Sequence, residues 1–143
     1  MVKTSELKAA KLREGIKMAR LQESLLARVE DMCDRVIRVA DAASQAGMPR
    51  RLLDQMLASG TSVGANVFEA DEAMSRADFV KCLCIAVKEL NETRFWLRLC
   101  TRHTWVEPGR LQPLIEETTS LKKVLGAMIS RTKSASTVKR RSV

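Results

Sequence analysis

Apolar residues recur at intervals of three and four in four separate segments of this chain. That spacing places them on one face of an α-helix, because successive helical residues are about 100° apart around the axis. No segment alternates apolar and polar residues in the manner of a half-buried strand, and no βαβ rhythm is present. The pattern predicts an all-α fold with helices near residues 21–46, 49–73, 75–102 and 111–131.

Local signals mark where these helices begin and end. Gly47 suits the position just after a helix, and Pro49 suits the first turn of the next one. Ser75, followed three residues later by Asp78, is typical of a helix N-terminus. Four helices with short connections, each with one apolar stripe, predict an antiparallel up-down-up-down four-helix bundle over residues 21–131.

Length and cysteine usage narrow the class of protein. The chain has 143 residues, enough for one domain with a real core. Its longest apolar run, residues 124–129, is far shorter than the roughly 20 residues of a membrane span, and we expect neither secretion nor membrane insertion. The four cysteines form no CxxC pair and lie in apolar-periodic segments, which favours reduced thiols in the cytoplasm. They are Cys33, Cys82, Cys84 and Cys100.

Positive charge is concentrated at the two ends of the chain. Residues 1–20 carry a net charge of +4, residues 131–143 carry +5, and the segment between them carries −1. We expect a basic N-terminal extension over 1–20 and a disordered basic tail over 132–143. Such ends attract phosphate backbones, although many basic termini serve only solubility. The candidate nucleic-acid-binding residues are Arg13, Lys17, Arg20, Arg50, Arg51, Lys139, Arg140 and Arg141.

The second and third predicted helices carry more apolar surface than one core stripe. The second predicted helix has a second apolar run beside its core stripe, made of Leu53, Leu57, Gly64 and Phe68. The third has apolar residues off its core face, namely Cys84, Ile85, Phe95, Trp96, Leu99 and Cys100. A helix that is apolar over most of its circumference is buried on more than one side. The sequence therefore favours a homo-oligomer, with a wide stripe of ordinary exposed hydrophobes as the alternative. The candidate interface residues are Phe68, Ile85, Phe95 and Trp96.

A carboxylate-bridged metal site is the enzyme possibility that a four-helix bundle raises. Such a site needs Glu-x-x-His on two helices and a Glu on each of the others. The chain offers Glu69-x-x-Glu72 and Glu89-x-x-Glu92, but its only histidine, His103, falls in a loop. His103 also lies three residues from Cys100 with no third group to orient a nucleophile. We therefore expect no metal, no cofactor and no catalytic residue.

The sequence around Gly60 and Gly64 predicts close packing. The two glycines lie one helical turn apart, so a facing helix can approach their backbone. Ser62, Asn66 and Glu69 form a polar stripe beside the core, which we interpret as a structural network rather than a ligand site. Arg94 falls on the core arc of the third helix, and we expect it to pair with Glu69.

Residues between 55 and 100 resemble a known family. They are Ser59-Gly60-Thr61-Ser62-Val63-Gly64-Ala65-Asn66-Val67, Glu69-Ala70, Ser75, Asp78-Phe79, Ile85-Ala86, Lys88-Glu89, Glu92-Thr93 and Trp96-Leu97-Arg98-Leu99. This set is similar to the four helix bundle protein family, whose members include proteins encoded in intervening sequences of bacterial 23S rRNA genes. A related protein is the accessory variability determinant of diversity-generating retroelements. Cys82 departs from the family pattern, which has a Lys there, and this weakens the case for a basic surface on that helix.

The resemblance implies a structural role for the motif residues and no catalytic role for any of them. These residues are Ser62, Gly64, Asn66, Glu69, Lys88, Glu89, Glu92 and Trp96. Arg94 joins this structural set because of its position on the core arc of the third helix. The retroelement relative implies a ring-shaped homo-oligomer, a pentamer, with DNA or RNA and a reverse transcriptase as partner classes.

The sequence thus predicts a non-enzymatic, oligomeric four-helix-bundle protein that binds nucleic acid non-specifically through its basic ends. The alternative is a protein-interaction scaffold or accessory subunit without nucleic-acid binding. A metal-dependent enzyme has the least support.

Overall fold

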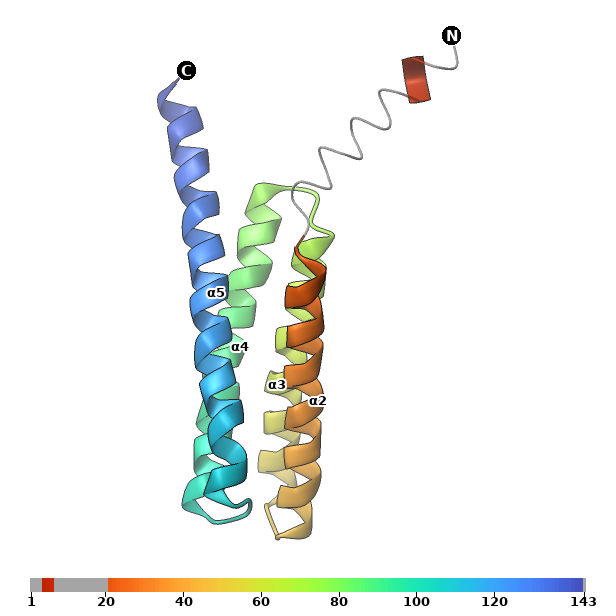
Figure 1. The fold of residues 1–143 in the computed structure, drawn as a ribbon, viewed down its shortest axis with the longest axis vertical. Helices are drawn as coiled ribbons and strands as arrows, with labels where there is room; N and C mark the ends of the chain where they lie inside the picture. The colour runs from red at the N-terminus through yellow and green to blue at the C-terminus, as the bar shows by residue number, and fades with distance from the viewer. Residues whose placement is uncertain (1–3, 7–20, 143) are drawn as a thin grey trace.

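The computed structural model describes residues 4–6 and 21–142, and within these ranges it is helical with no strand. Residues 4–6 form one short helical turn. The four long helices are α2 (Glu23–Gln45), α3 (Arg50–Asp71), α4 (Arg76–Arg102) and α5 (Pro108–Arg141) (Figure 1). The predicted all-α class is confirmed.

Each long helix packs mainly against two of the others. α3 packs against α2 and α4, α4 also packs against α5, and α5 reaches α2 through a smaller interface. In Figure 1 the α2–α3 and α4–α5 connections lie at the lower end of the molecule, and the α3–α4 connection lies at the upper end. This arrangement follows from the short connections, since each one brings the chain back beside the preceding helix.

The predicted helix boundaries agree with the structure to within three residues, except at the C-terminus. Gly47 adopts φ +96° just after α2, a left-handed conformation that glycine accommodates without strain. Ser75 caps α4, and its Oγ accepts a hydrogen bond of 3.1 Å from the Asp78 N–H. Pro108 occupies the first turn of α5, three residues before the predicted start.

The core is a single apolar cluster to which all four helices contribute. Its largest fully buried side chains are Met32, Met56, Leu83, Leu90, Leu97, Leu111, Leu114, Leu121, Leu125, Val29, Val36 and Val63. Leu53, Gly64 and Cys100 are also buried within the single chain, so their assignment to a surface between subunits is wrong. The reason is that α3 and α4 each have two neighbours within the chain, which widens the arc that each helix buries.

The close approach predicted at the paired glycines is confirmed. A Cβ atom added at Gly60 would lie 2.6 Å from Val36 Cγ1, and one added at Gly64 would lie 2.8 Å from Cys33 Sγ. The Cys33 thiol also donates to the Gly60 carbonyl oxygen over 3.3 Å. The two glycines therefore allow α2 to lie directly against the backbone of α3.

The predicted disorder of the basic tail is wrong for the residues described, because α5 continues to Arg141. No glycine or proline interrupts the chain between Ala127 and Arg141. Hydroxyls in this segment donate to carbonyl oxygens four residues earlier, as in Thr132 to Met128 (2.8 Å) and Ser136 to Thr132 (3.1 Å). Once a helix is nucleated, each further residue adds a hydrogen bond at little cost, so the helix continues without an apolar period.

Candidate nucleic-acid interface

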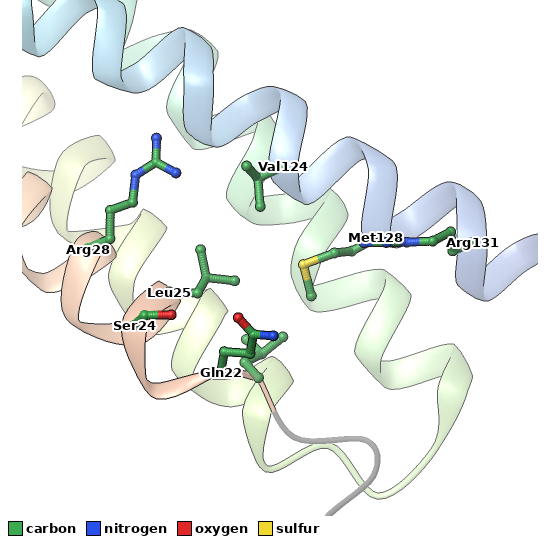
Figure 2. Close-up of a pocket in the computed structure, with 8 residues that line it drawn as sticks. Gln22, Ser24, Leu25, Arg28, Val124, Met128 and Arg131 are labelled. Atoms are coloured by element: carbon green, nitrogen blue, oxygen red, sulfur yellow. The ribbon is translucent and has the colours of Figure 1, made fainter.

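The start of α2 and the C-terminal half of α5 diverge and leave an open space of about 380 Å³, which we call the fork. Its lining residues are Leu21, Gln22, Ser24, Leu25, Arg28, Val124, Met128 and Arg131. Figure 2 shows the α2 residues on one wall and Val124, Met128 and Arg131 on the other. Four of the lining residues are apolar (Leu21, Leu25, Val124 and Met128) and four are polar or charged (Gln22, Ser24, Arg28 and Arg131).

The first described residue after the N-terminal extension is anchored at this fork. The Leu21 backbone N–H donates to Asp71 Oδ1 over 2.7 Å, which fixes the chain against the end of α3. Leu21 therefore lines the same space as Arg131, where the basic part of α5 begins.

The charge inside the fork is partly neutralised. Arg28 forms a two-point salt bridge with Glu117, and its Nη2 also donates to Ser120 Oγ over 2.6 Å. The hydrogen bond to Glu117 raises the pKa of Arg28 above its usual value. Arg131 is exposed and has no ion pair within the described part of the chain, so it carries the free positive charge of the fork.

The structure separates the predicted nucleic-acid-binding residues into two groups. Arg140 and Arg141 are exposed at the end of α5, and Lys139 precedes them in the same helix. Arg50 and Arg51 are exposed at the start of α3, at the opposite end of the molecule (Figure 1). Arg50 also pairs with Asp54 at 3.5 Å. Arg13, Lys17 and Arg20 lie outside the described residues.

A second basic site lies on α4, and the sequence analysis did not identify it. Arg94, Arg98 and Arg102 line a groove of about 430 Å³ together with Asn91, Phe95 and Leu99. We call this site the arginine groove. The Arg94 Nε is buried and has no hydrogen-bond partner. The signal was the spacing of three arginines four residues apart, which places them along one side of a helix.

The predicted pair between Arg94 and Glu69 is wrong. Glu69 is exposed, and its Oε2 lies 4.0 Å from Cys82 Sγ. The buried hydrogen bond between Thr93 Oγ1 and Ser59 Oγ (3.1 Å) sets the register of α3 against α4. In this register Arg94 lies about 18 Å further along α4 than Cys82, beyond the reach of Glu69. Within the polar stripe, Asn66 Nδ2 bonds to Ser62 Oγ at 3.2 Å, and Glu69 takes no part.

Glu69→Gln is therefore expected to change the free energy of unfolding by less than about 0.5 kcal/mol, because the carboxylate it removes is exposed. Arg94→Met is expected to leave it unchanged or raise it by about 1 kcal/mol, because a buried unsatisfied donor is removed. Urea unfolding followed by circular dichroism measures both effects. A decrease of about 3 kcal/mol in the free energy of unfolding of either variant would instead indicate that Glu69 and Arg94 do form a buried ion pair.

Glu89, Glu92 and Trp96 of the family motif lie together on the side of α4 that is nearer to α3. Glu92 Oε1 accepts a hydrogen bond of 3.3 Å from Trp96 Nε1. Burial and the neighbouring Glu92 raise the pKa of the half-buried Glu89. Lys88, next to Glu89, is exposed.

Two of the four candidate interface residues are exposed. Phe95 is 55% exposed and Phe68 is 39% exposed, whereas Ile85 and Trp96 are half-buried. The rings of Phe95 and Trp96 meet edge to face, with centroids 5.0 Å apart. Trp96 also packs against the core of its own chain.

The residues that could serve a reaction are kept apart. Cys100 is fully buried, and burial raises the pKa of its thiol to about 11. His103 is exposed and stacks on Trp105 with ring centroids 4.6 Å apart. Within residues 4–6 and 21–142, no three His, Cys, Asp or Glu side chains come together to hold a metal ion.

The 23S rRNA-intervening sequence protein family matches residues 24–127 of the chain, from the start of α2 to well within α5. The chain belongs to this family. A crystal structure of a protein of unknown function from the S23 ribosomal protein family of Bacteroides thetaiotaomicron is similar, with a TM-score of 0.70 and 32% identity. The similarity covers 73% of this chain and 97% of that one. A comparison with curated proteins finds no match.

The family match confirms the resemblance found in the sequence. It includes one of the two basic sites and leaves out the other. The 23S rRNA-intervening sequence match includes the arginine groove, but it ends before Arg131 and begins after residue 20. Both basic ends of this chain therefore lie outside the matched residues. Across the described part of the chain, no helix combines the length and apolar character that crossing a bilayer requires.

Proposed function

We propose that this family member is a non-enzymatic, oligomeric scaffold that binds nucleic acid without sequence preference. In this proposal α2–α5 form an antiparallel up-down-up-down four-helix bundle, and the basic ends of the chain contact phosphates. Binding of this kind uses Lys and Arg against the nucleic-acid backbone rather than the base edges.

One observation carries the proposal: Leu21 and Arg131, which adjoin the two basic ends in the sequence, line the same fork. Leu21, which follows an extension with a net charge of +4, lines the same space as Arg131, which begins a segment with a net charge of +5. The intervening chain carries −1, so the excess positive charge belongs to the two segments that these residues adjoin in the sequence. The continuation of α5 to Arg141 supports the proposal further, because it presents Lys133, Arg140 and Arg141 on a helix.

The proposed assembly is supported by the exposed apolar residues that the single chain leaves uncovered. Phe68 and Phe95 are large aromatic side chains exposed on α3 and α4. A ring, and a pentamer in particular, is implied by the sequence resemblance alone. Repetition of the fork around an oligomer would convert weak single contacts into useful avidity.

The proposal predicts retention of random duplex DNA or RNA with a steep salt dependence. Each phosphate that the protein neutralises adds about 0.9 to the slope of log affinity against log salt on duplex DNA. Removing residues 132–143 is expected to weaken binding on all sequences and to flatten this slope by about 0.9 for every phosphate that the shortened protein no longer neutralises. The matched control is Arg50→Gln with Arg51→Gln at the other end of the molecule, which is expected to leave the slope nearly unchanged.

Two results would contradict the proposal. One is a full-length protein that retains neither DNA nor RNA at about 50 mM salt, where phosphate contacts are strongest. The other is a tail deletion with an unchanged slope beside an Arg50 and Arg51 variant with a reduced one. The first result would favour the alternative function, a protein-interaction scaffold whose basic ends serve solubility.

A further inference from the structure

The outward face of α4 has two edges of opposite charge. Arg94, Arg98 and Arg102 lie along the groove on one edge, and Glu89 and Glu92 lie on the other. Arg98 and Trp96, which is bonded to Glu92, are two residues apart and thus about 160° apart around the helix axis. Phe95 and Leu99 lie between the two edges, and the exposed Lys88 lies there too, one turn before Glu92.

Neither edge forms an ion pair within the described part of the chain. The ion pairs among the described residues are Arg28–Glu117, Arg35–Asp31 and Arg50–Asp54, and none of them involves α4. The arginine groove has no acidic residue in its lining, and the Arg94 Nε lacks a partner. On the other edge, burial and Glu92 raise the pKa of Glu89, and no cation among the described residues offsets this shift.

We propose that a second copy of this chain docks on this face of α4, with its Glu89 and Glu92 side chains facing Arg94, Arg98 and Arg102. The proposal rests on the assembly proposed above and names the surface that forms it. Each copy supplies the charge that the other lacks, so the arginine groove is complete only in the assembly. Phe95 and Leu99 become buried between the two rows of ion pairs.

Two features favour a second copy over a nucleic acid as the occupant. Phe95 and Leu99 give the groove an apolar part, and Phe95 is one of the most exposed large hydrophobic residues described. Aromatic residues and arginines together are typical of the central part of protein interfaces. The acidic edge repels phosphates but complements the arginines of another copy.

Reversal of charge on each edge tests this surface. Arg98→Glu and Glu92→Arg, made singly, each place like charges opposite one another and are expected to weaken self-association roughly 100-fold. Self-association is expected to return in an equimolar mixture of the two variants and in the variant that carries both changes. The mass is measured by light scattering over a range of protein concentrations, and circular dichroism confirms that each variant remains helical. Arg38→Glu on the exposed side of α2 is the matched control and is expected to leave the mass unchanged.

The results distinguish this surface from assembly in general. A wild-type mass of 16.0 kDa at micromolar concentration overturns both the surface and the proposed assembly. An assembled wild type with unaffected Arg98→Glu and Glu92→Arg variants overturns the surface alone. Loss of nucleic-acid retention in Arg98→Glu without a change in mass overturns it in favour of phosphate binding at the groove. Failure of the mixture to associate, with both single variants folded and monomeric, also overturns it.

Discussion

Replacing Leu97 by alanine is expected to lower the free energy of unfolding by about 2–5 kcal/mol. Leu97 has no exposed surface and lies within the common core of the four helices. Its removal costs the transfer free energy of the deleted methyl groups and leaves a cavity that rigid neighbouring helices cannot close. Urea unfolding measures the loss as a lower midpoint with an unchanged dependence on urea.

The matched control lies two residues away on the opposite face of α4. Phe95 is 55% exposed, so Phe95→Ala is expected to have little effect on the stability of the single chain. Both variants should be compared at protein concentrations where assembly is absent, because binding of a second copy raises apparent stability. Equal losses for Leu97→Ala and Phe95→Ala in the dilute protein would mean that the packing of α4 described above is wrong.

Gly60→Val is expected to lower the free energy of unfolding by about 1–3 kcal/mol through overpacking. The added Cβ would lie 2.6 Å from Val36 Cγ1, and Val36 is itself fully buried and stiff about its χ1 angle. α2 would therefore have to move away from α3. The control is Gly126→Ala in the middle of α5, where an added Cβ has no atom within 4 Å. There alanine is expected to stabilise the protein by about 0.5–1 kcal/mol. Thermal unfolding of the two variants should thus shift in opposite directions, and a stabilised Gly60→Val would contradict the close helix contact.

The helices were predictable because their signals are local. Ser75 caps α4 and Gly47 ends α2 through backbone geometry that a few neighbouring residues determine. The core stripes follow from spacing alone, as for Val29, Met32 and Val36 on α2. The close approach at Gly60 was also predictable, because glycine in a helix interior is costly unless packing requires it.

What the sequence could not supply was the register between helices. Glu69 and Arg94 share the α3–α4 hairpin, but the position of the connection puts Glu69 beside Cys82 instead. The sequence also does not show how many helices pack against α3 and α4. Leu53 and Cys100 were therefore assigned to an interface between subunits, although their own chain buries them. The arginine groove was missed because charge was counted by chain segment, and α4 lies within a region that is neutral on average.

The extension of α5 beyond the matched region affects how a polyanion can bind to its basic residues. A free tail would have to give up its conformational freedom whenever a partner bound it, at a cost of several kcal/mol. On a continuous helix, Lys133 and Arg140 instead stand about two turns apart on the same side, some 10 Å from each other along the axis. The positive charges on this part of α5 therefore have a fixed spacing and direction. A polyanion must align with the axis of α5 to reach more than one of them.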